Sequence, residues 1–302
     1  MTPEYQQGLI VRALGGFYYV KTPGGTYECK ARGLFRKEGI SPLVGDRVKI
    51  QLTGQQGFIE EIDERRNSLI RPPVANLDRL VLVVSVVSPP PNLLVLDKMI
   101  AIAEYKNIEP VLAVTKTDLC EDSSEYDRLC ALYREAGFRV FAVSAVTREG
   151  TRPLREYLSD GINCFCGNTG AGKSSLLNAI MPDLALKTAE ISQKLGRGRH
   201  TTRHAELYEL EGGGYIADTP GFSAVELSRY EVIRKEELQR CFREFAPYLD
   251  GCRFTGCSHT CEKGCAVLIA AGEGRIAESR LQSYRVMYED AKQIKEWELD
   301  KR

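Results

Sequence analysis

The chain has 302 residues, with 41 basic and 41 acidic side chains and a formal net charge of +0 at pH 7. This length predicts about two or three domains, and the hydrophobic content of 43% excludes a wholly disordered chain. No apolar run approaches the ~20 residues of a membrane helix, and the first residues do not resemble a signal peptide. We therefore expect a cytoplasmic protein whose cysteines are thiols or metal ligands rather than disulfides.

The N-terminal region, residues 1–68, contains short strand-like segments separated by turn residues. Five such strands without a long helical period predict a small β-barrel of the OB type. The pattern fits either a solvated barrel or one that binds nucleic acid. The expected strands are residues 9–14, 16–22, 26–32, 46–52 and 57–63.

The central region, residues 69–226, alternates buried strands with helices. A continuous apolar run at 79–87 is typical of a strand buried on both faces, and the segment 93–107 has helical spacing. Further strand segments are expected at 109–118, 138–145 and 161–167. This alternation predicts a parallel doubly wound α/β sheet.

A phosphate-binding loop follows the last of these strands. Gly167 to Ser174 fits the pattern G-x-x-x-x-G-K-[ST], and the segment that follows is expected to be a helix. In such loops the backbone N–H groups surround the phosphates, Lys173 reaches the β- and γ-phosphates, and Ser174 ligates Mg²⁺. The candidate nucleotide-binding residues are Gly167, Asn168, Thr169, Gly170, Ala171, Gly172, Lys173, Ser174 and Ser175.

Two further segments after the phosphate loop suit a nucleoside triphosphate with Mg²⁺. In "DTPG" we expect Asp218 to face the Mg²⁺ site and the Gly221 backbone to contact the γ-phosphate. The glycine-rich segment 194–204 carries Thr201 and Thr202, either of which suits the second hydroxyl on Mg²⁺, with Thr202 taken as the ligand.

Base-reading candidates precede the phosphate loop. Asp118 in "TKTD" is placed to accept from the guanine N1 and N2 donors, and the stem of Lys116 to pack on the ring. The pair Ser144-Ala145, at the next strand end, is placed to bring a backbone N–H to the guanine O6. Because the base readers come before the phosphate loop, the order predicts a circularly permuted P-loop GTPase. Such permutation is tolerated where chain ends lie close together at the surface.

The C-terminal region, residues 227–302, is expected to be helical around a cysteine-rich loop. The loop "CRFTGCSHTCEKGC" offers five candidate ligands for the four places of a tetrahedral zinc site. We assign the structural zinc to Cys252, Cys257, His259 and Cys265, with Cys261 spare.

Three other classes of protein fit parts of this pattern. A metabolic P-loop ATPase or kinase is disfavoured by Asp118 and by Ser144-Ala145. A zinc hydrolase is disfavoured because a site closed by four protein ligands leaves no position for chemistry. A nucleotide-binding RNA-binding protein without significant turnover remains the alternative.

Taken together, these segments resemble the RsgA (YjeQ) family of ribosome small subunit-dependent GTPases over nearly the whole chain. The family-like stretches are "VGDRV", "RRNSLIRP", "GNTGAGKSSLLN", "GRGRHTTRHAEL", "DTPGF" and "CRFTGCSHTCEKGC". The resemblance implies a monomeric bacterial factor that binds GTP or GDP, Mg²⁺ and one Zn²⁺. It also implies that the factor acts late in small-subunit assembly beside other assembly factors. Its barrel and zinc domain would hold ribosomal RNA, and subunit-stimulated hydrolysis would release it.

Two positions depart from the family pattern. The guanine motif of the family usually starts with Asn, whereas this chain has Thr115. A hydroxyl keeps one hydrogen bond but not the pair that an amide makes, so we expect a looser hold on the nucleotide. In the cysteine loop Lys263 stands where the family often has Pro, which leaves the ligands intact.

The catalytic residues are expected to be His200, Thr202 and Lys173. Many GTPases orient the attacking water with a Gln after the glycine of the DxxG motif, but this chain has Phe222 there. His200 resembles the family's candidate for positioning that water. The alternative is that His200 is only packed or solvated, and that His204 or an RNA group takes the role.

Overall fold

The structure, a computed structural model, describes residues 4–37, 39–53, 56–182, 205–218 and 231–294. The chain forms two compact units. One comprises Met1–Arg79, Leu154–Phe165 and Ile180–Phe222, and the other comprises Leu80–Pro153, Cys166–Ala179 and Ser223–Arg302. The predicted domain boundaries after residues 68 and 226 stay a prediction. In the part of the chain that is described, every helix is too short or too polar to cross a bilayer.

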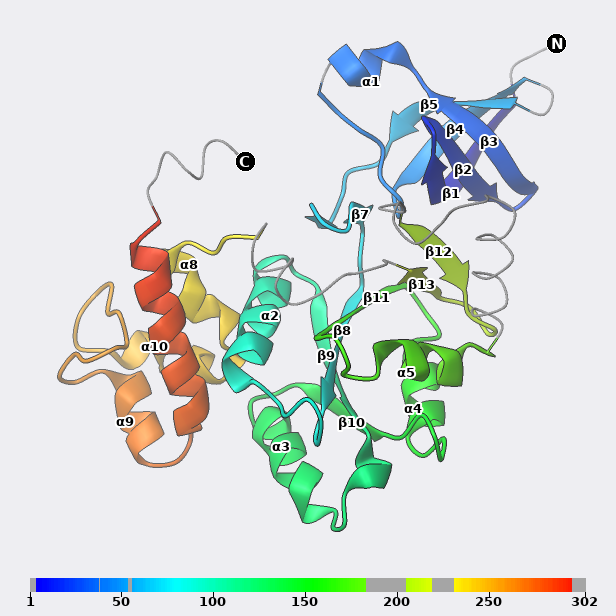
Figure 1. Ribbon diagram of the computed structural model, residues 1–302. Helices are drawn as coiled ribbons and strands as arrows, with labels where there is room; N and C mark the ends of the chain where they lie inside the picture. The colour runs from blue at the N-terminus through cyan, green and yellow to red at the C-terminus, as the bar shows by residue number, and fades with distance from the viewer. Residues whose placement is uncertain (1–3, 38, 54–55, 183–204, 219–230, 295–302) are drawn as a thin grey trace. The chain divides into compact units, whose positions relative to one another are not determined.

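The first unit begins with a closed five-stranded barrel (Figure 1). Strand β1 pairs with both β2 and β4, β3 lies between β2 and β5, and β5 pairs with β4, so that the sheet closes on itself. This closure confirms the predicted small OB-like barrel. The elements are β1 (Glu4–Leu14), β2 (Phe17–Thr22), β3 (Gly25–Ala31), the short helix α1 (Gly33–Lys37), β4 (Arg47–Thr53) and β5 (Gln56–Ile62).

The barrel core follows from the alternation of apolar residues along these strands. In β4, Val48 and Ile50 are fully buried, while Arg47 on the other side of the strand is exposed. The hairpin between β1 and β2 turns at Gly15 and Gly16, both with positive φ, which suits a two-residue hairpin loop. The fully buried core side chains are Ile10, Val20, Cys29, Val48, Ile50 and Ile59.

Three further strands of the first unit continue from the barrel. Strand β11 (Ile162–Gly167) runs parallel to β13 (Tyr215–Asp218), and β13 pairs antiparallel with β12 (Glu206–Glu209). Strand β12 then pairs antiparallel with β1, where Glu206 lies opposite Arg12. The barrel and these strands of the first unit are therefore joined by strand pairing.

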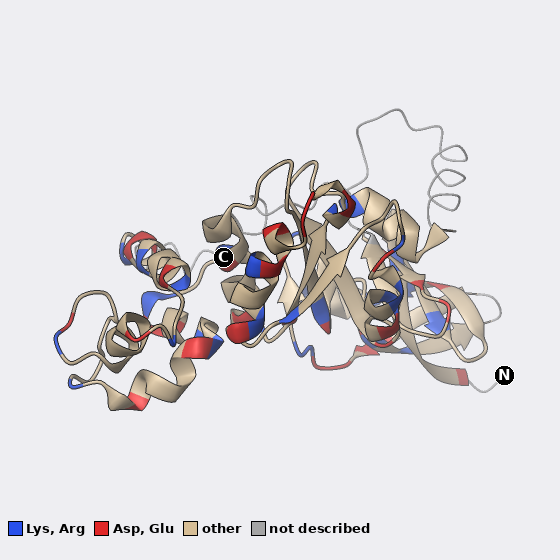
Figure 2. Ribbon diagram, turned by 90° about the horizontal axis from the view of Figure 1, so that it is seen from below, with Lys and Arg blue, Asp and Glu red and all other residues tan. Residues whose placement is uncertain are grey.

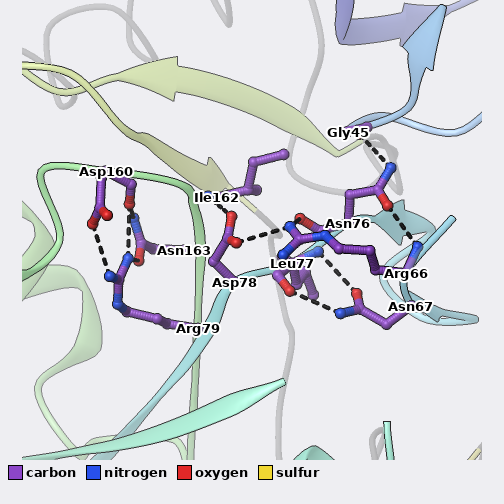
Figure 3. A network of polar contacts seen from close by, with 10 residues as sticks. All are labelled: Gly45, Arg66, Asn67, Asn76, Leu77, Asp78, Arg79, Asp160, Ile162 and Asn163. Carbon is purple, nitrogen blue, oxygen red and sulfur yellow. Dashed lines mark hydrogen bonds and ion pairs between the residues drawn. The ribbon is translucent and has the colours of Figure 1, made fainter. Parts of the chain in front are cut away.

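A polar network joins the barrel to β11 (Figure 3). The Asp78 carboxylate accepts one hydrogen bond from Arg66 (2.8 Å) and another from the Ile162 backbone N–H (2.7 Å). A Cβ at Gly161 would lie 2.4 Å from Asp78 Oδ2, so this approach requires glycine. Since Asp78 immediately precedes β8 (Arg79–Ser85), the network fixes the place where the chain leaves the barrel.

The same network extends to either side of Asp78 through the amides of Asn67 and Asn76 and through the guanidinium of Arg79 (Figure 3). Asn67 exchanges two hydrogen bonds of 2.9 Å with the backbone of Leu77, and Asn76 donates to the Gly45 carbonyl of the barrel (3.0 Å). Arg79 donates to both the carbonyl and the carboxylate of Asp160. The family-like segment "RRNSLIRP" therefore has a structural role in this unit. The segment contains the short strand β6 (Ser68–Leu69), which pairs with β7 (Val74–Ala75) just after it.

The second unit contains a parallel sheet and the C-terminal helices. Strand β9 lies between β8 and β10 and is parallel to β10, as the alternation of strands and helices predicts. In the C-terminal region, short 3₁₀ segments replace part of the expected helix before the cysteine loop, and the second of them contains Pro247.

Figure 2 shows basic and acidic residues interspersed along the chain, in line with its net charge. The elements are α2 (Leu93–Tyr105), β9 (Glu109–Thr115), η1 (Thr117–Leu119), α3 (Ser124–Glu135), β10 (Arg139–Val143), α4 (Thr151–Tyr157), α5 (Lys173–Ile180), α8 (Lys235–Leu238), η2 (Gln239–Cys241), η3 (Arg243–Gly251), α9 (Ala266–Gly272) and α10 (Glu278–Lys292).

A buried ion pair holds α10 against α2. The Arg280 guanidinium donates to Asp97 Oδ1 (2.6 Å) and to both carboxylate oxygens of Glu244, and side chains of the Arg280–Asp97 pair are 1% and 0% exposed. Tyr133 of α3 donates to the same Asp97 oxygen (2.8 Å). Burial, and then the Asp97 carboxylate, raise the pKa of Tyr133, which keeps this hydroxyl protonated. One carboxylate therefore joins three helices.

We predict that Asp97→Ala destabilises the chain strongly. Removing one partner of a buried ion pair leaves a charge without full compensation and costs about 3–5 kcal/mol. The matched control is Asp290→Ala, which removes a partner of Lys98 between the same two helices at a pair that is 29% and 58% exposed. That change should cost less than about 1 kcal/mol. Urea unfolding of the full chain compares the two, and equal shifts would contradict the role of Asp97.

Candidate nucleotide site and metal cluster

The base-reading candidates lie at the ends of two neighbouring strands. Strands β9 and β10 are parallel, and Thr115 lies opposite Val143 in their register. The residues that follow, Lys116 and Ser144, therefore leave the sheet at the same edge. This arrangement brings together the two motifs that the sequence places 28 positions apart.

The turn after β9 presents Lys116 and Asp118. Lys116 has a left-handed backbone conformation (φ 64°), and its Nζ donates to the carbonyl oxygen of Ser88, in the loop between β8 and α2. Asp118 lies in η1 with an exposed carboxylate. An exposed acceptor at a strand end, beside a lysine stem, suits the edge of a purine ring that carries N–H donors.

Ser144 shapes the second turn rather than offering its side chain to a ligand. Its hydroxyl oxygen is fully buried with the rest of the residue and accepts from the N–H groups of Val146 (3.2 Å) and Thr147 (3.0 Å). Its own N–H donates to the Glu149 carbonyl (3.0 Å). Ala145, which follows directly, is half-buried at the strand end.

The phosphate loop begins where β11 packs closely on β8. A Cβ at Gly167 would lie 2.5 Å from the Val83 carbonyl oxygen, which explains glycine at this first position. Gly170 and Gly172 have φ of +81° and +92°, a conformation that favours glycine. Helix α5 then starts at Lys173, so its first N–H groups face the site, as they do in helices that bind phosphate.

Thr115 joins the two halves of the site. Its hydroxyl donates to the Ala171 carbonyl of the phosphate loop at 2.5 Å, with the Val84 carbonyl farther away at 3.3 Å. Thr115 and Ala171 are 3% and 2% exposed. The base-reading strand and the phosphate loop are therefore tied by a buried hydrogen bond.

Several predicted site residues lie outside the described residues. They are His200, Thr201, Thr202 and Gly221. Asp218 is described through its backbone, which ends β13 and pairs with Glu206 of β12. Its predicted place near Mg²⁺ stays a prediction.

The structure brings the four assigned cysteine and histidine ligands together. Their ligand atoms all lie within 4.8 Å of one another, whereas Cys261 is exposed and is not part of the group. The Sγ atoms of Cys252 and Cys265 are 3.8 Å apart, and His259 Nδ1 lies 3.5 and 3.3 Å from them. A tetrahedron with metal–sulfur bonds of about 2.3 Å has edges of about 3.8 Å, so the donor set fits zinc.

Two residues that support this cluster were not identified from the sequence. Gln239 Oε1 lies 2.7 Å from His259 Nε2 and, by accepting its proton, leaves Nδ1 to face the cluster. Burial lowers the pKa of His259, which favours the neutral imidazole that a metal needs.

The second supporting residue is Glu262. Burial acts to raise the pKa of its carboxyl group, but hydrogen bonds from Ser258 and from backbone N–H groups lower this pKa to about 2. Sequence spacing carries no signal for Gln239, which is 20 residues from His259.

Family comparisons cover almost the whole chain. The family model described as "RsgA GTPase" matches residues 62–228, and the one described as "RsgA N-terminal domain" matches residues 7–59. A protein of Caldanaerobacter subterraneus subsp. tengcongensis named "Small ribosomal subunit biogenesis GTPase RsgA" is 48% identical over 96% of this chain and 97% of its own length. A protein of the same name from a Geobacillus species is 45% identical over 96% of this chain and 98% of its own length.

Solved structures agree with these relatives. YjeQ from Thermotoga maritima has a TM-score of 0.83 and 34% identity, and the match covers 97% of this chain and 100% of that one. YloQ, described as a circularly permuted GTPase, has a TM-score of 0.80 and 36% identity, and covers 96% of each chain. The predicted permuted GTPase fold is thereby confirmed.

Proposed function

Because this chain belongs to the RsgA family of GTPases, we propose that it acts late in the maturation of the small ribosomal subunit. The chain is a GTP hydrolase. In this proposal the subunit stimulates hydrolysis, and hydrolysis releases the chain from the subunit. The observation that carries the proposal is the match to relatives named small ribosomal subunit biogenesis GTPase over 96% of this chain.

Guanine specificity is assigned to the turn after β9. Asp118 accepts from N1 and N2 of the base, and the Lys116 stem packs on the ring. The Ser144-Ala145 turn offers a backbone N–H to O6. The exposed Asp118 carboxylate and the buried hydrogen bonds of Ser144 support this division of roles.

Phosphate and Mg²⁺ binding are assigned to the loop at the start of α5. Lys173 neutralises charge on the β- and γ-phosphates, and Ser174 is the hydroxyl ligand for Mg²⁺, with Thr202 as the second. Bound Mg²⁺ supplies charge compensation during phosphoryl transfer. The start of α5 at Lys173 and the exposed Ser174 support this assignment.

Structural zinc is assigned to Cys252, Cys257, His259 and Cys265. Four protein donors close the site, so the metal would organise the loop between η3 and α9 rather than take part in hydrolysis. The Gln239 contact to His259 supports this assignment, because partners of this kind orient metal ligands.

The partners and location follow from the same assignment. We propose that the chain contacts ribosomal RNA through the barrel and the cysteine loop, and meets other small-subunit assembly factors there. It would act as a cytoplasmic monomer. Aromatic and basic side chains on the barrel surface, such as Lys30 above the Phe17 ring (5.1 Å), suit contacts with bases and phosphates.

We predict that Asp118→Asn weakens GTP binding and relaxes discrimination against xanthine nucleotides. Lost charge-assisted hydrogen bonds of about 1.5–3 kcal/mol correspond to a loss of at least about tenfold. Equilibrium titration with fluorescent GTP and XTP measures both effects. The control is Asp122→Asn. Asp122 is an exposed aspartate four residues further on, and its carboxylate accepts a hydrogen bond from the Ser124 N–H. If Asp118→Asn binds GTP as tightly as the parent chain, the base-reading assignment is wrong.

We predict one zinc per chain, lost on Cys265→Ser and retained on Cys261→Ser. The first change removes a buried member of the cluster, and the second removes an exposed cysteine in the same loop. The zinc content and the thermal unfolding temperature should fall together, since metal-binding energy at such sites is folding energy. The reverse pattern of metal loss would contradict the ligand assignment.

We predict that small ribosomal subunits accelerate GTP hydrolysis by the parent chain and that His200→Ala abolishes most of this stimulation. A correctly placed group that orients water contributes about 10²–10⁴-fold. Phosphate release is measured with GTP alone, with small subunits and with large subunits. GTP affinity and subunit binding should stay near those of the parent.

His204→Ala is the matched control for that experiment, because it removes the other histidine beside the two threonines. Full stimulation of His200→Ala would remove His200 from the mechanism. Absence of stimulation of the parent chain by small subunits would overturn the proposed function and favour an RNA-binding protein without significant turnover.

A further inference from the structure

A groove lies on the outer face of the barrel, near the point where β1 changes its pairing partner. Residues Glu4–Leu9 of β1 pair with β4, whereas Arg12 pairs with Glu206 of β12. The register of β1 against β2 shifts between Ile10 and Arg12, so Val11 is an extra residue on β1. Such a bulge bends a strand. The groove next to this bulge has a volume of about 500 Å³, and all its lining residues belong to the first unit.

The base of the groove is a row of three residues on adjacent strands. Leu9 lies opposite Lys21 of β2 on one side and opposite Arg47 of β4 on the other. The next residues along the strands, Ile10 and Val48, are fully buried in the barrel, so the alternation of side chains places the row on the outer face. Cα atoms of opposite residues are about 5 Å apart, so the two basic residues lie about 10 Å apart with a leucine between them.

The hairpin of β12 and β13 forms one wall of the groove. Glu209 and Tyr215 lie directly opposite each other in this hairpin. The Lys21 ammonium donates to the Glu209 carboxylate and lies 5.5 Å from the centroid of the Tyr215 ring, which is half-buried. An aromatic ring beside a cation suits a nucleotide, because every base has a face that stacks on such a ring.

Arg47 and Asp63 place two further charges at the groove. The Asp63 backbone N–H donates to the Arg47 carbonyl (2.9 Å), which keeps the two residues adjacent. Both residues are exposed, and within the described part of the chain neither side chain takes part in an ion pair. A guanidinium binds phosphate oxygens as a planar fork, and a carboxylate accepts from the hydroxyl groups of ribose or the N–H groups of a base.

We propose that this groove is a second nucleotide site, which binds one nucleotide. The base stacks on Tyr215 beside Lys21, the Arg47 guanidinium binds the phosphate, and the Asp63 carboxylate accepts from the ribose or the base. The volume falls within the range of about 300–1,000 Å³ of small-ligand pockets. A free nucleotide and an unpaired nucleotide of RNA share this chemistry. The inference goes beyond the proposed function, since none of these residues belongs to the proposed guanine site.

The test uses the full chain loaded with GDP and Mg²⁺ and then separated from free nucleotide, so that the proposed guanine site is filled. The probes are a fluorescent adenosine monophosphate and a labelled oligoadenylate, and fluorescence anisotropy measures their binding. Tyr215→Leu should weaken binding by about fivefold or more, because it removes the ring on which the base stacks. Tyr215→Phe keeps the ring and should bind like the parent chain.

Arg47→Gln is the second variant, at an exposed position, and it decides the question if Tyr215→Leu fails to fold. It should weaken binding and make the remaining affinity less dependent on salt, because one phosphate contact is lost. Binding of adenosine monophosphate would identify a free nucleotide as the ligand. Binding of the oligoadenylate alone would identify an unpaired nucleotide of RNA.

Tyr5→Leu is the matched control. Tyr5 is 50% exposed on the barrel, and the Lys49 Nζ lies 5.2 Å from its ring centroid, so it repeats the tyrosine–lysine contact outside the groove. This variant should bind the probes like the parent chain. An equal loss of affinity in Tyr5→Leu and Tyr215→Leu would overturn the proposal, because binding would then be spread over the barrel surface.

The proposal is also wrong if the parent chain binds neither probe, or if Tyr215→Leu and Arg47→Gln both bind like the parent. Failure of the proposed function is a separate result. It would be seen in the parent chain as an absence of GDP binding or of stimulation by small subunits.

Discussion

The buried hydrogen bond from Thr115 to the Ala171 carbonyl connects the two parts of the proposed nucleotide site. It joins the strand that carries the base-reading candidates to the candidate phosphate loop. A nucleotide has its base and its phosphates on opposite sides of a sugar, so the two protein segments must keep a fixed separation. A hydrogen bond that is shielded from water holds this separation better than an exposed one, because its loss leaves a buried carbonyl without a partner.

The remaining contacts of the second unit support the base-reading side of this junction. Arg280 and Tyr133 meet at Asp97 of α2, the helix that follows the Ser88 loop, and Ser88 in turn accepts from Lys116. A second arginine, Arg243, pairs with Glu104 and with Glu109, at the ends of α2 and β9. The C-terminal helices and the cysteine loop are thereby attached to the elements that carry the guanine candidates.

The first unit is held together by contacts of its own. Strand β12 continues the barrel sheet through β1, and the Arg12–Glu206 pair lies at their shared register. Asp78 ties the end of the barrel segment to β11, the strand that leads into the phosphate loop. Within the first unit, the barrel segment is therefore bonded directly to β12 and to the start of β11.

Much of this arrangement was predictable because its signals are local. The spacing from Gly167 to Ser174 specifies the phosphate loop, and the alternation in β4 and β5 specifies barrel strands. The four cluster ligands lie within 14 positions, so their grouping could be proposed from the loop alone. The partners of these residues could not be predicted. Gln239, Ser88 and Arg280 act through contacts with residues 20, 28 and 183 positions away, and no spacing rule connects them.

Thr115 illustrates the same limit at the level of one side chain. Its place in "TKTD" predicts a weaker contact to the nucleotide, whereas the fold directs its hydroxyl into the loop 56 positions later. The most direct measurement is a crystal structure of the chain with GDP and Mg²⁺. We expect the base against Lys116 and Asp118, the diphosphate against the loop from Gly167 to Ser174, and Thr115 still on the Ala171 carbonyl. A base bound away from Asp118, or a diphosphate bound away from that loop, would contradict the proposed site.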